Sequence, residues 1–429
     1  MQKRLFFVGL IAVTLFLTAC QPQTHEERPR VLVSTDIGGP DEDDFQSMGH
    51  LLMFNDYFDL EGLVSSPSFG GGGAEHIINL IDLYAKDFKG GKFRTAEELK
   101  SMVHQGVNRL APACGYRTST AGSNWIVTCA RKEDPRPLYV LVWGGLEDLA
   151  QALHDAPDIA DKIRVYWIGG PNKKFSPDAY SYIASHFPNL WFIECNAAYR
   201  GFIHNDKRES LYGREFYEQH MQGTSAVADD FVTHCGGIVR MGDTPSVLYM
   251  LNYKEMDPAN PAEEHWGGRF EPMHHSSRRV FDRPLTERDT VPVFSIVELH
   301  LKGPERVDDD GTEPCLTLNC LGQDWDGFYM GEGNYQVRYA PKMAGEVPYT
   351  ITGAVEQRGI FMVENSWPGE PHPDDWQMGD NWWTDVKEPT EFEGAHQGAH
   401  QGAQTVARWR DDALRLWAER CLEVKQKNQ

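Results

Sequence analysis

Short apolar runs alternate with amphipathic segments from Arg30 to about residue 196. The apolar runs predict strands, and the segments between them carry apolar residues at helical spacing. The predicted strands cover residues 31–35, 60–66, 138–145, 162–170 and 190–196, and the predicted helices cover 43–58, 74–86, 146–156 and 177–187. Continuous apolar strands that are each followed by a helix indicate a parallel sheet with both faces buried. The fold class predicted for this region is therefore α/β, with a mostly parallel sheet flanked by helices.

The pattern changes near residue 285. Runs with period two, or rich in β-forming residues, follow one another without helices at 291–301, 315–322, 335–341, 348–355 and 359–367. Turns separate these runs, as is typical of a β-sandwich. We therefore predict an all-β sandwich over residues 285–366.

The last helical segment, residues 405–420, has an apolar stripe that needs a partner surface. The stripe contains Val406, Trp409, Ala413, Leu416 and Trp417. A small sandwich is a poor source of such a surface, so we expect this helix to return to the α/β domain. The predicted divisions are a first part of the α/β domain at 30–284, an insertion at 285–366, and a return segment with the C-terminal helix at 367–429.

The first 20 residues read as a targeting segment. Two cations precede an apolar run that is short for a membrane span, and the run ends in Leu-Thr-Ala-Cys. This ending resembles a bacterial lipobox, which implies a signal peptide at 1–20, lipidation at Cys20 and a polar linker at 21–29. The resemblance implies an exported, lipid-anchored protein of the cell envelope, and Gln21 after the cysteine favours the outer membrane. Ordinary cleavage and an uncleaved anchor are the alternatives.

Charge and cysteine content narrow the range of ligands. The 429 residues carry a formal net charge of −22, which disfavours nucleic acid and anionic lipid as partners. Small neutral or cationic molecules and metal ions fit this charge better.

The seven cysteines after Cys20 contain no CxxC pair, and only Cys315 and Cys320 are close enough in sequence to suggest a local disulfide.

Carboxylates gather where the first predicted strand ends. Asp36 follows that strand, and Asp41, Asp43 and Asp44 precede or open the next helix. Ligands bind at the carboxyl ends of strands in such sheets, and clustered carboxylates repel one another unless a cation neutralises them. On this chemistry a calcium site is one interpretation. The other is that Asp43 caps the helix while the remaining carboxylates are solvated.

The segment VLVSTDIGGPDEDD resembles the N-terminal aspartate motif of nucleoside hydrolases, DTDPGxDD, in the longer form of a bacterial family often labelled cellulose-binding. Residues 143–153 resemble the segment in which a threonine gives its carbonyl to the metal, and Glu147 stands at that place. Residues 241–251 resemble the late segment with a further metal-binding aspartate, here Asp243. The segments at 266–270 and 408–421 are also similar to that family.

The resemblance implies a calcium-dependent hydrolase acting on glycosyl compounds. Ca²⁺ would be held by Asp36, Asp44, Asp243 and the carbonyl of Glu147. Asp36 would act as the general base, and Asp43 would bind a sugar hydroxyl. The expected substrate is an N-ribosyl or related furanosyl compound, whose cleavage passes through a positively charged sugar that carboxylates stabilise.

The sequence also departs from the nucleoside hydrolase motif. Ser34 replaces the first aspartate, and Gly242 stands where many members have a histidine near the leaving group. Candidate substrate contacts lie in the strand-end loops, at Ser66, Asn172 and Asn196. The alternative for each is an ordinary turn or surface residue.

Residues 288–363 resemble the Ig-like domain often found ahead of glycoside hydrolase catalytic domains. Such a domain is more often a spacer than a catalyst. Three functional hypotheses remain: the calcium-dependent hydrolase, a non-catalytic glycan-binding surface lipoprotein on the same fold, and a structural partner of other envelope proteins. The retained aspartates favour the first two, and the missing histidine shifts weight toward the second.

Overall fold

A computed structural model describes residues 28–39, 42–203, 214–388 and 400–429. Cys20 and Asp41 lie outside these residues, so the expected lipidation site and one carboxylate of the first loop are not described. Among the described helices, none is both long enough and apolar enough to span a bilayer.

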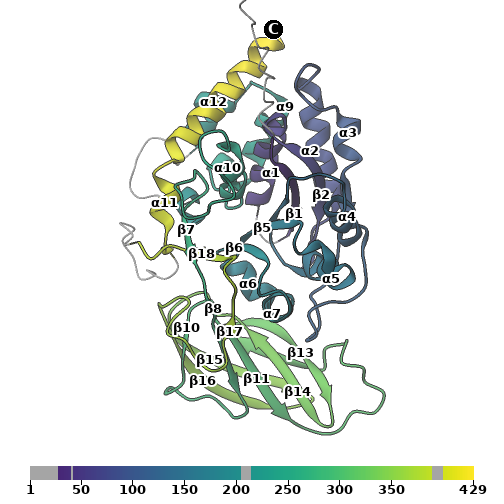
Figure 1. Ribbon diagram of the computed structural model, residues 1–429, viewed down its shortest axis with the longest axis vertical. Helices are drawn as coiled ribbons and strands as arrows, with labels where there is room; N and C mark the ends of the chain where they lie inside the picture. Colours follow the sequence, from purple (N-terminus) through teal and green to yellow (C-terminus); the bar gives the residue numbers. More distant parts are fainter. Residues whose placement is uncertain (1–27, 40–41, 204–213, 389–399) are drawn as a thin grey trace, which may run out of the picture.

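The larger domain is built on an eight-stranded sheet with the order β3-β2-β1-β4-β5-β6-β18-β7 (Figure 1). Its strands pair in parallel except β7, which is antiparallel to β18. Their bounds are β1 Arg30–Thr35, β2 Asp59–Ser65, β3 Val103–Gln105, β4 Leu138–Trp143, β5 Ile163–Ile168, β6 Trp191–Cys195, β7 Phe270–Pro272 and β18 Trp382–Asp385. The predicted α/β class with a mostly parallel sheet is confirmed.

Helices cover both faces of this sheet because both faces of its strands are apolar. Leu32, Val140 and Val165 share one core with α4, α5 and α7. Val31 and Leu141, on the other face, pack with α1, α2, α10 and α12. The helix bounds are α1 Asp43–Met53, α2 Ala74–Asp87, α3 Ala96–Lys100, α4 Ala121–Ala130, α5 Glu147–Asp155, α6 Pro171–Phe175, α7 Pro177–His186, α8 Arg200–Ile203, α9 Ala226–Asp230, α10 Thr244–Leu251, α11 Ala403–Ala407 and α12 Arg410–Lys427.

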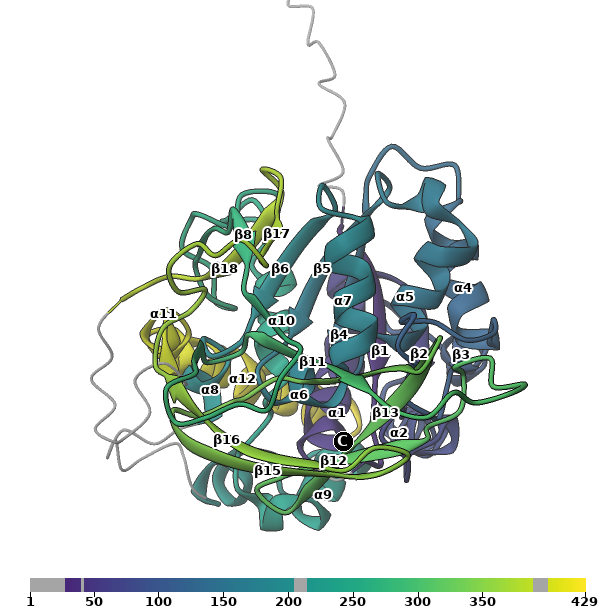
Figure 2. The ribbon, with the colours of Figure 1, turned by 90° about the horizontal axis from the view of Figure 1, so that it is seen from below.

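The second domain is all-β, as predicted. Its strands form one hydrogen-bonded sheet, nearly barrel-shaped, with the order β10-β16-β15-β12-β13-β14-β11-β9 (Figure 2). The bounds are β9 Arg278–Phe281, β10 Thr290–Pro292, β11 Ile296–Lys302, β12 Leu316–Cys320, β13 Gln323–Gly331, β14 Asn334–Tyr339, β15 Gly345–Gly353 and β16 Gln357–Glu364. The sheet includes β9, which precedes the expected start at residue 285. Cys315 and Cys320 are both free thiols, so the local disulfide is absent.

After the all-β domain the chain returns to the first sheet. A small pair of strands, β8 (His275–Ser276) and β17 (Trp376–Gln377), lies where the chain leaves and re-enters. β18 then pairs with β6 and β7. Finally, α12 buries Leu414, Trp417 and Val424 against the α1 side of the α/β domain.

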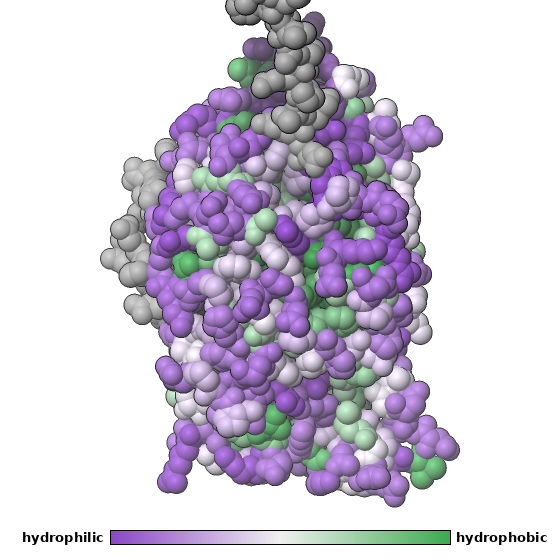
Figure 3. All heavy atoms as spheres, viewed as in Figure 1, coloured by the Kyte–Doolittle hydropathy of each residue, from purple (hydrophilic) through white to green (hydrophobic). Residues whose placement is uncertain are grey.

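The two domains are in direct contact through polar and aromatic side chains. Arg338 of β14 donates to Asp178 of α7 at 2.6 Å and to the carbonyl of Ala113 at 2.8 Å. The indole of Trp325 in β13 donates to the carbonyl of Lys174 at 2.8 Å. On the face shown in Figure 3, hydrophilic residues cover most of the surface and hydrophobic residues gather in small patches.

Candidate metal centre

The end of β1 sets the geometry of the first carboxylate loop. The backbone N–H of Asp36 donates to the carbonyl of Trp143 at 2.9 Å, which ties the loop to the end of β4. The N–H of Gly39 donates to the Asp36 carbonyl at 2.8 Å and closes a tight turn. Asp36 therefore lies at the carboxyl edge of the sheet, where the sequence placed it.

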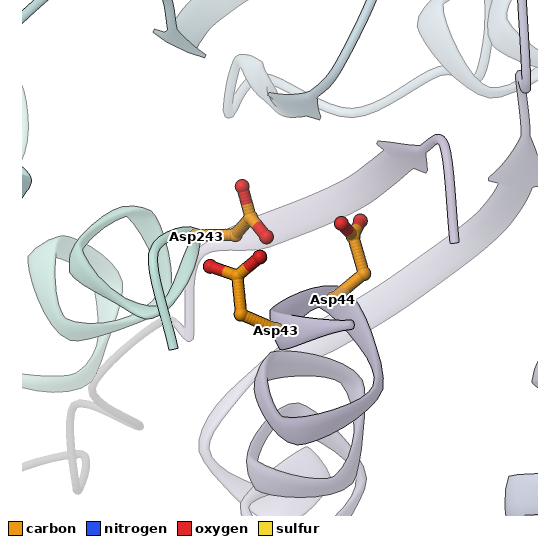
Figure 4. Close-up of side chains that lie close together, drawn as sticks. All are labelled: Asp43, Asp44 and Asp243. Atoms are coloured by element: carbon orange, nitrogen blue, oxygen red, sulfur yellow. The ribbon is translucent and has the colours of Figure 1, made fainter. Parts of the chain in front are cut away.

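Three aspartates from two helix starts meet at this edge. Asp43 and Asp44 are in the first turn of α1, and Asp243 directly precedes α10. Ligand oxygens of the three lie within 4.8 Å of one another, and all three residues are buried (Figure 4). The sheet thus brings together side chains that are about 200 positions apart in the sequence.

Hydrogen bonds hold two of these carboxylates in place. The hydroxyl of Thr35, the last residue of β1, donates to Oδ1 of Asp44. The backbone N–H of Gly242 donates to Oδ2 of Asp43. Each bond connects one aspartate to a neighbouring strand end or helix start, so the carboxylates are oriented before any ligand binds.

Two glycines make the close approach possible. A Cβ atom on Gly144, whose φ is +136°, would lie 2.6 Å from Cγ of Asp36. A Cβ atom on Gly242 would lie 2.4 Å from Oδ2 of Asp43. The space that a larger side chain would need at residue 242 is therefore taken by the Asp43 carboxylate.

Electrostatics disfavour a fully ionised cluster in the absence of a cation. The pKa of Asp44 is raised well above its ordinary value, mainly by burial. The negative charges of Asp243, Asp36 and Asp43 add to this effect in that order, and the Thr35 hydrogen bond opposes it. A cation would relieve both the desolvation and the repulsion. A donor set made of carboxylate oxygens fits a hard cation such as Ca²⁺ or Mg²⁺ rather than zinc.

The side chain of Glu147 is directed elsewhere. Its Oε1 accepts a hydrogen bond from Ser176 at 2.8 Å, and burial raises its pKa to about 7. The negative charge of Asp148 raises this pKa further. Since the expected ligand atom of Glu147 is its backbone carbonyl, that role stays a prediction.

The three candidate substrate residues follow the ends of β2, β5 and β6, with Asn172 in the short helix α6. The N–H of Ser66 donates to the Thr35 carbonyl at 2.7 Å, so Ser66 lies beside the end of β1. The side chain of Asn172 donates to the Ile168 carbonyl at 2.8 Å. Asn196 is wholly buried and bonds Gly170 and Glu194 at 2.8 and 2.7 Å. Asn172 and Asn196 thus have structural bonds, and their contact with substrate stays a prediction.

Two features near the site were not predicted from the sequence. Asp385, at the end of β18, accepts hydrogen bonds from the backbone N–H groups of Asn196, Ala197 and Ala198 at 3.0, 2.9 and 3.1 Å. It therefore holds the loop after β6 from a segment nearly 190 residues later. The sequence gives only a weak signal for it, because β18 is short and its partner strands are distant in the sequence.

The second feature is a ring cluster beside the aspartates. Phe45 of α1 stacks on His234 with ring centroids 4.1 Å apart, and its ring meets His76 edge-on at 5.2 Å. A Cβ on Gly38 would lie 2.5 Å from Nε2 of His76, so this imidazole packs on the turn that follows Asp36. Aromatic side chains separated this widely in the sequence give no local pattern.

Comparison with known proteins identifies the family of the larger domain. Residues 30–270 match the family model described as cellulose-binding Sde182, nucleoside hydrolase-like domain. Residues 290–354 match a domain of unknown function, DUF5060. No curated protein matches the chain.

Three of the solved structures that are similar to this chain cover different shares of it. A nucleoside hydrolase-related hypothetical protein from Saccharophagus degradans, associated with carbohydrate metabolism, is 18% identical with a TM-score of 0.48 over 79% of this chain and 100% of its own. An inosine-uridine preferring nucleoside hydrolase from Bacillus anthracis is 16% identical with a TM-score of 0.37 over 58% of this chain and 86% of its own. A putative glycoside hydrolase from Bacteroides vulgatus is 27% identical with a TM-score of 0.15 over 18% and 16%.

Proposed function

The chain belongs to the family of cellulose-binding Sde182, nucleoside hydrolase-like domains, and from this we propose that it is a calcium-dependent hydrolase of an N-ribosyl or related furanosyl glycosidic bond. The observation that carries the proposal is the buried group of Asp43, Asp44 and Asp243. Burial of several carboxylates is costly without a cation, so such a group is typical of a metal centre. The negative charge of Asp36 contributes to the raised pKa of Asp44, and Asp36 would complete the metal centre.

Asp36, Asp44, Asp243 and the carbonyl of Glu147 would hold the Ca²⁺. When bound, the cation supplies Lewis acidity and offsets the negative charge of the carboxylates. Asp36 would accept a proton from the attacking water, whose oxygen forms a bond to the anomeric carbon. The glycosidic bond breaks with its electron pair on the leaving group. Asp43, fixed by the Gly242 N–H, would bind a sugar hydroxyl, and the surrounding carboxylates stabilise the positive charge of the sugar.

A second candidate function is glycan binding without turnover. Two observations favour it: the family model is described as cellulose-binding, and Gly242 has no side chain that could protonate a leaving group. Asp43 occupies the space beside that glycine. On this alternative the aspartates would keep a structural cation.

Release of free sugar distinguishes the two candidates. Purified protein would be incubated with nucleosides and furanosides, with Ca²⁺ or with a chelator, and the Asp36→Asn variant would serve as the matched control. The hydrolase predicts release that requires Ca²⁺ and falls by at least about a hundredfold in the variant, since a general base contributes that much or more. Binding of glycans without release in any condition would favour the second candidate.

We also propose that the protein is anchored through lipid on Cys20, in the outer membrane. The cationic start, the short apolar run and the Leu-Thr-Ala-Cys ending support this proposal. More than one acyl chain on the cysteine would make the anchor stable. Cys20→Ser should move the protein from the membrane fraction to the soluble fraction. A variant that stays with the membranes after a high-salt wash would indicate an uncleaved anchor.

A further inference from the structure

A hollow of about 610 Å³ lies at the junction of the two domains. Its walls come from the loop at 113–116, from α5 and α7, and from β9, β14 and the strand β17 of the return segment. In Figure 2, α7 lies between α5 and the β8–β17 pair. The aspartates are on α1 and before α10, which cover the opposite face of the sheet. The hollow is therefore a separate feature from the metal centre.

Partly exposed aromatic rings line this hollow. Tyr182 of α7 meets Tyr116 edge-on with ring centroids 5.1 Å apart, and it stacks on His186 at 4.4 Å. Trp376 adds a third large ring to the hollow. It belongs to β17, in the return segment that follows the all-β domain. Rings of this kind combine a flat apolar face with a polar edge, and such a face matches the C–H face of a sugar ring.

The charged groups of the hollow are already neutralised. Arg278 donates to Glu298 at 2.6 Å, and Arg338 donates to the same carboxylate at 2.7 Å. Arg338 also pairs with Asp178 at 2.6 Å. Because both guanidinium groups are held by carboxylates, the hollow offers little attraction to an anion. The electrostatics favour a neutral ligand.

Hydrogen-bonding groups remain for such a ligand. His154 uses Nδ1 toward the Tyr182 hydroxyl at 3.1 Å, and His186 uses Nδ1 toward the Ser185 hydroxyl at 2.9 Å. Within the described ranges, Nε2 of both exposed imidazoles makes no hydrogen bond. These atoms can donate to or accept from sugar hydroxyls, depending on the tautomer.

We propose that this junction hollow is a binding site for a neutral oligosaccharide, with Tyr182 and Trp376 as the stacking rings. Its volume lies within the range of about 300–1,000 Å³ that is usual for small-molecule sites, which are often found at domain interfaces. The site takes residues from both domains and from the return segment. The all-β domain thus completes a sugar site rather than carrying one alone. The proposal does not depend on turnover at the aspartates.

Calorimetric titration of the full-length protein tests the proposal. The probes are cellohexaose, xylohexaose, maltohexaose and mannohexaose, with inosine as a probe that carries an aromatic base and no oligosaccharide chain. The variants are Tyr182→Ala and Trp376→Ala, with Tyr182→Phe as the variant that keeps the ring. Tyr253→Ala is the matched control, because Tyr253 lines a different hollow beside Arg28. Asp44→Asn, with chelator, separates this site from the metal centre.

We expect at least one hexasaccharide to bind, and each alanine variant to weaken binding about tenfold, as loss of one stacking ring should. Tyr182→Phe, Tyr253→Ala and Asp44→Asn should bind as the wild type does. If Tyr182→Ala fails to fold, Trp376→Ala decides. The proposal is overturned if no hexasaccharide binds, or if hexasaccharide binding depends on Asp44 or Tyr253. It is also overturned if the ring variants weaken the binding of inosine but not that of a hexasaccharide. If Asp44→Asn loses hydrolysis but still binds the hexasaccharide, the metal centre and the junction hollow act as separate sites.

Discussion

The ionised form of Asp44 is opposed by burial and by the charges of three neighbouring carboxylates. Asp44→Asn replaces this carboxyl group by a neutral amide, so the variant without calcium should be at least as stable as the wild type. It should also lose the stabilisation that calcium gives. A ligand at about a hundred times its dissociation constant adds roughly 2.7 kcal/mol to the free energy of unfolding. Thermal melting with Ca²⁺ and with chelator measures both effects.

Asp158→Asn is the control for this prediction, because Asp158 is exposed and pairs with Arg131 on the surface. It should keep the full calcium response, since surface pairs contribute about 1 kcal/mol or less. Equal calcium responses of wild type and Asp44→Asn would mean that the aspartate group is not the metal site. The assignments of Asp36 and Asp43 would then lose their support.

Gly242 limits what the site can contain. Gly242→Ala would place a Cβ atom 2.4 Å from Oδ2 of Asp43, so the carboxylate must move. Because oxygens of Asp43 lie within 4.8 Å of those of the ligands Asp44 and Asp243, a displaced Asp43 carboxylate should disturb them. We expect calcium affinity to fall by at least about tenfold, as for other displaced supports of a metal site, while the protein stays folded. Calcium titration measures this affinity. In the control, Gly49→Ala on the same helix as Asp43, the nearest side-chain atom is at 3.7 Å. An unchanged affinity in Gly242→Ala would show that Asp43 has more freedom than its hydrogen bond indicates.

At the scale of single elements, the sequence predicted the strands that contain a continuous apolar run. β1, β4 and β5 are nearly continuous runs of buried side chains, and an amphipathic helix follows β1 and β4. Local patterns therefore located the sheet edge where Asp36 and Asp44 lie. β7 and β18 could not be predicted in this way, because each is short and its partner is distant in the sequence. The loop contacts of Asp385 were missed for the same reason.

Asp385 connects β18 to the loop after β6, and its protonation should affect stability. Burial is the largest cause that raises its pKa, to about 7, and the three backbone hydrogen bonds oppose this shift. The folded form therefore binds a proton that the unfolded form releases near pH 4. Its contribution is full below about pH 4 and is lost as pH rises through about 7. A shift of about three pKa units corresponds to roughly 4 kcal/mol.

Chemical unfolding of wild type and Asp385→Asn between pH 4 and pH 8 tests whether the contribution of Asp385 to stability falls as pH rises. The wild type should lose stability relative to the variant as pH rises, by up to a few kcal/mol. Asp82→Asn, at an exposed position in α2, should follow the pH dependence of the wild type. A difference between Asp385→Asn and wild type that is constant with pH would mean that Asp385 is ionised throughout this range.

At the scale of the whole molecule, the two domains share one hydrophobic core. Buried residues of α5 and α7 belong to the same cluster as Trp325, Tyr339 and Trp367. The sequence indicated two domains because the chain changes its pattern. Strands alternate with helices in the first part, and runs with period two follow one another near residue 285 and beyond. It could not indicate how they dock, because the docking residues come from helices, loops and β-strands that are far apart in the sequence. The ion pairs around Arg338 are the clearest example.

Arg338 fixes the all-β domain to α7. Its side chain is 11% exposed, and it donates to Glu298 of its own domain and to Asp178 of the other. The arginines at Glu298 lower the pKa of that carboxyl to about 2, although burial, the largest cause, opposes this. Arg338→Met would keep much of the side-chain volume but leave both acids without this partner. Breaking a buried pair in this way costs about 3–5 kcal/mol, and we expect a loss of that size in the unfolding of the junction.

Differential scanning calorimetry measures this loss, and a second transition should separate in Arg338→Met as the all-β domain uncouples. Arg306→Met is the matched control, since Arg306 is exposed and pairs only with the nearby Asp309 among the described residues. Its melting curve should stay within about 1 kcal/mol of the wild type. Adding Asp178→Asn to Arg338→Met should recover part of the loss, because the uncompensated charge on α7 is removed. If the double variant recovers nothing, the loss comes from packing of the Arg338 stem rather than from the charge that crosses the junction.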